Sequence, residues 1–265
     1  MADAMPQPER DSLDVKSALR FSHVNRTARE ILSAIRELRH LRAHALEPLC
    51  VLLRTNLAVH MDVSTLYTAL NTQKCALCPA AFGGFFFLPT ATRCCLTCIA
   101  SSPETQVTHV SRLADAANIP AGTLAKQIPV LHTLPDSRKR IVSLQHARAV
   151  LAGTGMSTAA VERTLSRFPD SLTLRFQAAT SLPHVDRATG TADSGVSCKG
   201  CQVAFERDFS DEHLELRDRF YSKAGFAAHF EECEEAGRLW EDSQAGEVKV
   251  KEPKGGVGGG RVRGI

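Results

Sequence analysis

Four cysteines between residues 75 and 98 constrain this chain more than any other feature. They form two C-x-x-C pairs, Cys75 with Cys78 and Cys95 with Cys98, and sixteen residues separate the pairs. Two residues between cysteines let both sulfurs turn toward one cation, and two such pairs supply the four ligands of a tetrahedral zinc site. The spacing therefore predicts a closed, structural zinc module. The alternative is that these cysteines are buried or disulfide-bonded.

The residues between the two pairs add two expectations. Cys94 directly precedes Cys95, so a rival pairing of Cys94 with Cys98 exists, but the two-residue gap that repeats the first pair favours Cys95. The glycine pair at 83–84 is followed by the apolar run 85–88. This pattern predicts a tight hairpin at the glycines, with its second strand covering the metal.

A second set of metal-ligand residues follows later in the chain. Cys198 and Cys201 form another C-x-x-C pair, and His229 and Cys233 are four residues apart, so they share one face of a helix. Together they predict a two-Cys, His, Cys finger around a second structural zinc ion. His213 is a rival ligand, but the helix of His229 already holds Cys233. The alternative is an apolar helix with an incidental core histidine.

Composition bears on compartment and on core size. The first residues are polar, without an apolar signal segment, and no run approaches the roughly 18 apolar residues that span a bilayer. We therefore expect no membrane association and a location in the cytoplasm or nucleus, where cysteine pairs usually bind metal. Aromatic residues make up only 6% of the chain, which favours small units held by metal over a single large core.

The remaining pattern predicts a mostly α-helical fold with short β-hairpins at the two metal sites, a small α+β architecture. The expected units are a disordered segment at 1–10, a helical segment at 11–60, the four-cysteine zinc module with an appended strand and helices at 61–152, a helix and linker at 153–197, the finger at 198–243, and a disordered Gly/Lys/Arg tail at 244–265.

Local signals place several helix starts. Asp14 is expected to cap the first helix, and Ser143 to end a short strand and cap the helix after it. Asp62 or Ser64 is expected to cap the helix that leads into Cys75. Ser157 is expected to cap a helix over 157–167. The stretch LTLRFQ alternates apolar and polar residues and predicts a strand over 172–177.

Two further patterns in the N-terminal segment leave alternatives open. His40 and His44 are four residues apart and could bind a metal ion together, but no third ligand lies near them in the sequence. Five arginines between residues 26 and 42 form either a basic patch for an acidic partner or a solvated helix face, which is the more usual meaning of a charge run.

Five stretches of this sequence resemble a known family. They are LYTALNTQKCALC, GGFFFLPTATRCCLTC, IVSLQHARAV, SCKGCQ, and GFAAHFEEC with Arg238-Leu239-Trp240. They look like fungal F-box proteins that carry zinc modules after the F-box, over roughly residues 11–242. The resemblance implies that the chain docks on the Skp-type adaptor of cullin–RING ubiquitin ligases and selects a protein substrate. Because DSLDVKSALRFSHVNRTAREIL resembles only the second half of an F-box, we expect a partial F-box-like segment at 11–60.

Three classes of function compete. An enzyme is disfavoured, because closed four-ligand sites leave zinc no position for water and no Gly-x-Ser-x-Gly, Walker or His-Glu-x-x-His motif occurs. A nucleic-acid-binding zinc-finger protein is the alternative, but acidic residues such as Asp208 and Asp211 would repel phosphate. The sequence therefore predicts a non-catalytic, zinc-stabilised interaction module that serves as a substrate receptor or scaffold.

Overall fold

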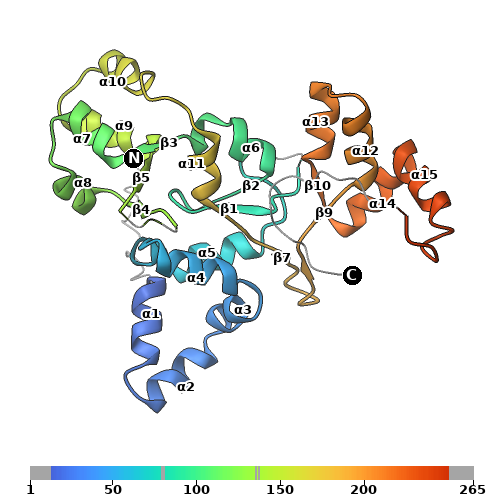
Figure 1. Ribbon diagram of the computed structural model, residues 1–265. Coiled ribbons are helices and arrows are strands. Elements are labelled where there is room, and N and C mark those ends of the chain that lie inside the picture. Colours follow the sequence, from blue (N-terminus) through green and yellow to red (C-terminus); the bar gives the residue numbers. More distant parts are fainter. Residues whose placement is uncertain (1–12, 79–80, 135, 137, 251–265) are drawn as a thin grey trace, which may run out of the picture.

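The computed structural model describes residues 13–78, 81–134, 136 and 138–250. This part of the chain is mostly helical with short strands, as the sequence predicted, and the strands form four small sheets. Figure 1 shows the β1–β2 hairpin at the centre, with the helices α1–α3, α7–α10 and α12–α15 extending from it in three directions. The predicted disorder at 1–10 lies outside the described residues, as do residues 251–265 of the tail predicted at 244–265, whereas residues 244–247 form turns.

The N-terminal part is built from helices, as predicted. Asp14 caps the first of them, because its carboxylate accepts the backbone N–H of Ser17 at 2.9 Å. The apolar stripes of these helices face one another, and Leu41 and Leu52 are fully buried. The bounds are α1 (Val15–Ser22), α2 (Arg26–Ala34), α3 (Arg36–His44), α4 (Leu46–Arg54) and η1 (Ala58–His60).

A three-stranded sheet at the centre joins segments that are far apart in the sequence. β1 lies between β2 and β6 and pairs antiparallel with both. Strand β6 comes from the stretch that was expected to be a linker, and it sets Ala179 opposite Phe87. The elements around this sheet are α5 (Val63–Leu70), β1 (Phe85–Phe87), β2 (Thr92–Cys94), α6 (Leu96–Ser101), α11 (Leu172–Gln177) and β6 (Ala179–Ser181).

The hairpin turn does not lie at the glycine pair, contrary to the prediction. Strand β1 begins after Gly84, and the turn into β2 covers residues 88–91, where Ala91 adopts a left-handed φ of 54°. Gly83 instead lets the Arg93 side chain and the backbone of Lys74 pack closely against it. A Cβ at this position would lie 3.0 Å from Cγ of Arg93 and 3.1 Å from the carbonyl oxygen of Lys74.

The predicted strand over 172–177 is also wrong, because these residues form helix α11. Only one of its three alternating apolar residues, Leu174, packs against the large core, whereas Leu172 is 54% exposed and Phe176 is 43% exposed. Ser171 starts the helix, since its hydroxyl accepts the N–H of Leu174. The side chain that α11 buries is Arg175, which is 1% exposed.

A second lobe follows the central hairpin and has its own apolar core. In its sheet, β5 lies between β3 and β4. The predicted caps are confirmed: the hydroxyl of Ser143 accepts the N–H of His146, and that of Ser157 accepts the N–H of Ala160. The bounds are η2 (Pro103–Thr105), β3 (Val107–His109), α7 (Val110–Ala117), α8 (Ala121–Gln127), β4 (Leu131–His132), β5 (Arg140–Ser143), α9 (Leu144–Gly153) and α10 (Thr158–Leu165).

The C-terminal lobe is a small helical unit. Helices α12 and α15 touch at Gly200, where a Cβ would lie 2.3 Å from the backbone nitrogen of Ala236. The ring of Phe220 meets that of Phe85 edge-on at 5.3 Å, which connects this lobe to the central sheet. The strands β7 (His184–Val185) and β8 (Ala192–Asp193) pair with each other and precede this lobe. The bounds of the lobe are β9 (Val196–Ser197), α12 (Lys199–Arg207), α13 (Asp211–Arg217), β10 (Phe220–Tyr221), α14 (Lys223–Glu232) and α15 (Glu234–Asp242).

Apolar burial is uneven along the chain. One continuous core extends from Val15 in α1 to Val185 in β7, so the expectation of only small metal-held units is wrong for this part. The C-terminal lobe does fit that expectation, because its cluster of buried hydrophobic residues consists of Cys198, Cys201 and Ala236. Among the described residues, no helix combines the length and the apolar character needed to cross a membrane.

Candidate metal centres

The first candidate metal centre, here called the four-cysteine group, consists of Cys75, Cys78, Cys95 and Cys98. Their sulfur atoms all lie within 4.8 Å of one another, and those of Cys78 and Cys95 are 3.4 Å apart. A tetrahedral zinc ion with Zn–S bonds of about 2.3 Å needs sulfurs roughly 3.8 Å apart. The structure therefore brings the four predicted side chains to a spacing that one metal ion could bridge.

The backbone around the four-cysteine group holds the sulfurs in place. The sulfur of Cys75 accepts the N–H groups of Leu77 and Cys78, at 3.4 and 3.3 Å. Cys95 caps helix α6, and its sulfur accepts the N–H of Cys98 at 3.4 Å. Each C-x-x-C pair thus folds around its first sulfur. Donors directed at sulfur favour the thiolate form, which is the form that binds metal.

The four thiols of this group do not have equal acidity. The pKa of Cys75 falls to about 4, chiefly because the Cys95 thiol donates a hydrogen bond to it, while burial acts in the opposite direction. The same hydrogen bond, together with burial, raises the pKa of Cys95. Burial raises the pKa of Cys98 to about 12. Packing therefore favours the thiolate at Cys75 over that at Cys95 and Cys98, and a cation at the centre would favour ionisation of the thiols that bind it.

Cys94 does not belong to the four-cysteine group. It is fully buried at the end of β2, and its thiol lies 3.7 Å from the carbonyl oxygen of Thr92. Burial raises the pKa of Cys94 well above its ordinary value, so its thiol stays protonated. Consecutive side chains along an extended segment point in opposite directions, which is why Cys95 joins the group and Cys94 joins the core.

The second candidate metal centre, here called the cysteine–histidine group, consists of Cys198, Cys201, His229 and Cys233. The four ligand atoms again lie within 4.8 Å of one another. The sulfurs of Cys198 and Cys233 are 3.7 Å apart, and the sulfur of Cys201 is 3.3 Å from Nε2 of His229. The pair C-x-x-C opens helix α12, and the other two ligands come from the last turn and the C-terminal cap of α14.

Neighbouring side chains orient the ligands of the cysteine–histidine group. The ring of His229 stacks on Tyr221, with centroids 4.3 Å apart and planes tilted by 14°. This contact fixes the imidazole plane, so Nε2 faces the sulfurs. The pKa of Cys198 falls to about 5, mainly because of a hydrogen bond from Cys201. The pKa values of Cys201 and Cys233 are raised instead, so this group, like the first, combines an acidic thiol with less acidic ones.

The rival histidines lie outside both groups. Nδ1 of His213 is 3.2 Å from the carbonyl oxygen of Asp208 and 3.5 Å from its carboxylate. The rings of His40 and His44 meet edge-on with centroids 6.3 Å apart. Within the part of the chain that the structure describes, no third ligand joins this pair to form a group of three.

Two buried arginines, which no sequence pattern had indicated, lie beside the four-cysteine group and connect it to neighbouring elements. Arg93 is 3% exposed, and its guanidinium donates to the carbonyl oxygens of Ala69, Leu182 and Pro183 at 2.8, 3.0 and 3.0 Å. These bonds connect α5, β2 and the segment after β6. Burial lowers the pKa of Arg93 to about 10.

Arg175 makes the corresponding contacts from α11. Its guanidinium binds both carboxylate oxygens of Asp170, at 2.7 and 2.8 Å. It also donates to the carbonyl oxygens of Ile99 and Ser102 and to the hydroxyl of Thr105. Ile99 follows Cys98 in α6, so Arg175 fastens α11 to the helix that carries the second cysteine pair. The only sequence signal was an arginine inside an apolar stretch.

No protein-family model, curated protein or solved structure matches this chain. The two ligand groups and the surfaces of the described residues are therefore the basis for assigning a function.

Proposed function

We propose that this protein is a non-catalytic interaction module stabilised by two zinc ions, and that it serves as a substrate receptor or scaffold related to the F-box subunits of cullin–RING ubiquitin ligases. The observation that carries the proposal is that each group presents four ligand atoms within 4.8 Å. Four protein ligands complete the tetrahedron of a structural zinc ion and leave no position for a reactive water. Thiolate-rich sets favour zinc over magnesium or calcium.

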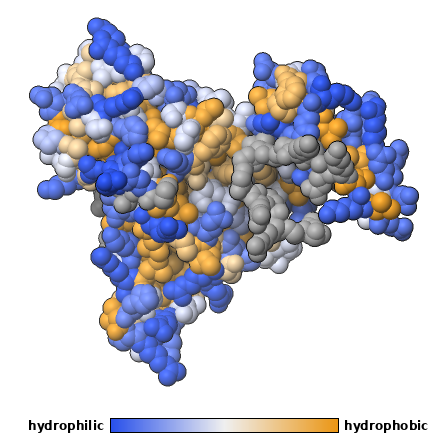
Figure 2. Space-filling model, viewed as in Figure 1, coloured by the Kyte–Doolittle hydropathy of each residue, from blue (hydrophilic) through white to orange (hydrophobic). Residues whose placement is uncertain are grey.

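The N-terminal helices support the adaptor part of the proposal. Phe21, Val24 and Ile31 in and between α1 and α2 are 45%, 66% and 53% exposed, although all three are large apolar side chains. Figure 2 shows hydrophobic surface between hydrophilic patches over the lower part of the molecule, where α1–α4 lie. Exposed apolar surface that forms a continuous patch is typical of a surface that binds another protein. This surface belongs to the segment that resembles part of an F-box.

Metal analysis of the purified chain tests the zinc part. We expect two zinc ions per chain, one for each group. Cys75→Ser and Cys198→Ser should each lower the content by one ion. A chain that folds with no bound metal would contradict the proposal, because the clustered thiols would then have a purely packing role.

Co-purification with a Skp-type adaptor tests the receptor part. We expect the full chain to retain the adaptor, and the double variant Val24→Asp with Ile31→Asp to lose it. Both side chains are exposed, so these changes should leave stability within about 0.5 kcal/mol. Phe209→Asp is the matched control, since Phe209 is an apolar residue that is 77% exposed in the C-terminal lobe. If neither the wild-type chain nor the control binds the adaptor, the receptor part of the proposal is contradicted and only the zinc scaffold remains.

A further inference from the structure

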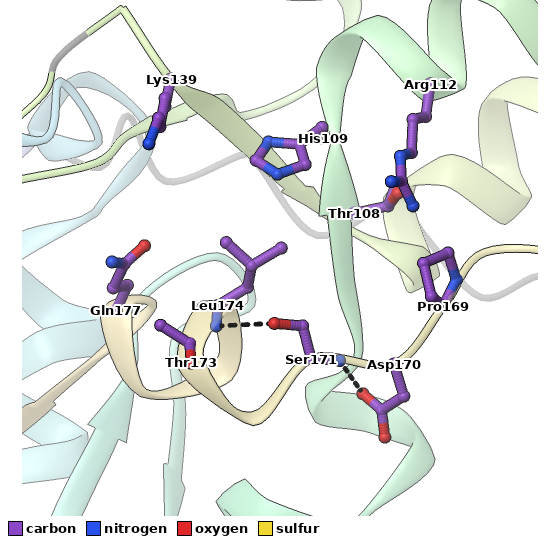
Figure 3. Close-up of a pocket in the computed structure, with 10 residues that line it drawn as sticks. All are labelled: Thr108, His109, Arg112, Lys139, Pro169, Asp170, Ser171, Thr173, Leu174 and Gln177. Carbon is purple, nitrogen blue, oxygen red and sulfur yellow. Dashed lines mark hydrogen bonds between the residues drawn. The ribbon is translucent and has the colours of Figure 1, made fainter.

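A pocket of about 380 Å³ lies between helix α11 and the β3–α7 corner of the second lobe. Figure 3 shows His109, Arg112 and Lys139 along one side of it and the residues of α11 along the other. The ten residues that line this α11 pocket are Thr108, His109, Arg112, Lys139, Pro169, Asp170, Ser171, Thr173, Leu174 and Gln177.

The charges around the α11 pocket are unbalanced. Arg112 and Lys139 are exposed, and neither has an ion-pair partner among the described residues. Asp170 is the only carboxylate in the lining, and both of its oxygens are bound by Arg175 at 2.7 and 2.8 Å. In Figure 3 this carboxylate lies at the lower end, beyond Ser171. The pocket therefore carries positive charge that no lining group neutralises.

The opposite wall adds neutral donors. Thr173 and Gln177 of α11 offer a hydroxyl and an amide. The hydroxyl of Ser171 accepts the N–H of Leu174 and keeps its own hydrogen free to donate. Guanidinium, ammonium and hydroxyl donors that surround a cavity are the usual partners of phosphate oxygens. The side chain of Leu174 enters between them in Figure 3 and gives the cavity an apolar part.

We propose that the α11 pocket binds a phosphate monoester. Arg112 and Lys139 neutralise its charge, and the α11 side chains bind its remaining oxygens. The cavity lies in the lower part of the size range of ligand pockets, which runs from about 300 to 1,000 Å³. It therefore has room for the carbon atoms that carry the phosphate as well. The monoester comes from a phosphorylated side chain of another protein or from a small phosphorylated molecule, since both present the same group.

This inference is independent of the proposed function. It uses no residue of either metal group and none of the exposed apolar residues of α1 and α2. Failure to retain the Skp-type adaptor would leave it unchanged, and the test below does not involve the adaptor.

Calorimetric titration of the full, metal-loaded chain tests the inference. The three probes are inorganic phosphate, a Gly-Gly-phosphoserine-Gly-Gly peptide, and the same peptide without phosphate. We expect one binding site for a phosphorylated probe and none for the unphosphorylated peptide. Tighter binding of the phosphopeptide than of inorganic phosphate would identify a protein side chain as the source, and equal binding would identify a small phosphorylated molecule.

Alanine variants test whether the phosphorylated probe binds in the α11 pocket. Arg112→Ala and Lys139→Ala should each weaken binding about tenfold, because each removes a charge-assisted hydrogen bond. Arg138→Ala is the matched control: it removes a neighbouring positive charge whose side chain is 92% exposed and which does not line the pocket. The inference is overturned if no phosphorylated probe binds, or if the control weakens binding as much as the two pocket variants do.

Discussion

The two metal groups have nearly the same ligand spacing but very different surroundings. The four-cysteine group lies at the edge of the large core, next to the fully buried Phe86, Leu88 and Ile99, and two buried arginines brace it. The cysteine–histidine group has little apolar burial beyond Ala236 and its own ligands. A metal ion bound to each group would therefore have different structural consequences: it would hold a local loop in one lobe and take the place of a core in the other.

Metal removal should show the largest difference between the two lobes. We expect a chelator, or Cys198→Ser, to unfold residues 196–243, because a structural zinc ion contributes about 10–16 kcal/mol to a small finger at neutral pH. Cys75→Ser should loosen residues 75–98 but leave α3 to α5 folded on their apolar core. Hydrogen exchange measured lobe by lobe checks this. Equal loss of protection in both lobes would show that the apolar core around the four-cysteine group does not stabilise it against metal loss.

Arg175→Met removes the arginine contacts that hold α11 to α6, and the cysteine–histidine group has no such contacts. We expect a loss of about 3 kcal/mol in the free energy of unfolding, since the carbonyl oxygens of Ile99 and Ser102 lose a charged donor and Asp170 loses its ion-pair partner. Denaturant unfolding of the large core measures it. The C-terminal lobe should unfold at an unchanged denaturant concentration, and a parallel shift there would contradict the separation of the two lobes.

The same variant should change the response to acid. The hydrogen bond from Arg175 lowers the pKa of Asp170 below its ordinary value of 3.8. A carboxyl whose folded pKa is lowered stabilises the fold above the unfolded pKa, and that stabilisation is lost as pH falls through the folded value. Wild-type stability should therefore fall more steeply below about pH 4 than that of the Arg175→Met variant.

Two glycines in the C-terminal lobe test how tightly it packs without a large core. Gly200→Ala would place a Cβ 2.3 Å from the backbone of Ala236, so we expect a loss of about 1–3 kcal/mol from overpacking. Gly237 lies in α15 with open space around its Cβ position. Gly237→Ala should stabilise the lobe by about 0.5–1 kcal/mol. Thermal unfolding of the pair of variants compares them, and equal effects would argue against the close contact of α12 with α15.

Cys94 and Cys95 compare a thiol of the large core with a predicted metal ligand. Cys94→Ser should leave zinc content unchanged, because its sulfur faces the large core, whereas Cys95→Ser should lower the content by one ion. The serine hydroxyl can donate to the carbonyl oxygen of Thr92, as the thiol does, so the stability cost should stay near 1 kcal/mol. A loss of zinc in the Cys94 variant alone would exchange the roles of the two residues.

Local features of this fold were predictable from the sequence, and distant ones were not. Asp14, Ser143 and Ser157 were correctly predicted as helix caps, because a cap depends on the next three residues. The ligand residues of both groups were chosen from spacing within short segments. The pairing of β6 with β1 was not predicted, because neither segment carries a local sequence pattern that indicates which strand it pairs with.

The errors have the same cause. The alternation of Leu172, Leu174 and Phe176 is a strand pattern, but α11 is decided by the contacts of Arg175 with a helix far back in the chain. The glycines at 83–84 were assigned to a turn, although Gly83 is small because Arg93 packs against it. In each case a tertiary contact outweighed the local preference.

The position of β6 has a consequence for how this protein is made. On the ribosome the β1–β2 hairpin and its four cysteines emerge long before residues 179–181, which complete the sheet. During that interval the edge of β1 has unpaired backbone groups, and an unpaired edge is where nascent chains associate wrongly. Early capture of a metal ion by the cysteines would hold the hairpin in register until its third strand arrives, so metal supply during translation should govern the yield of correctly folded protein.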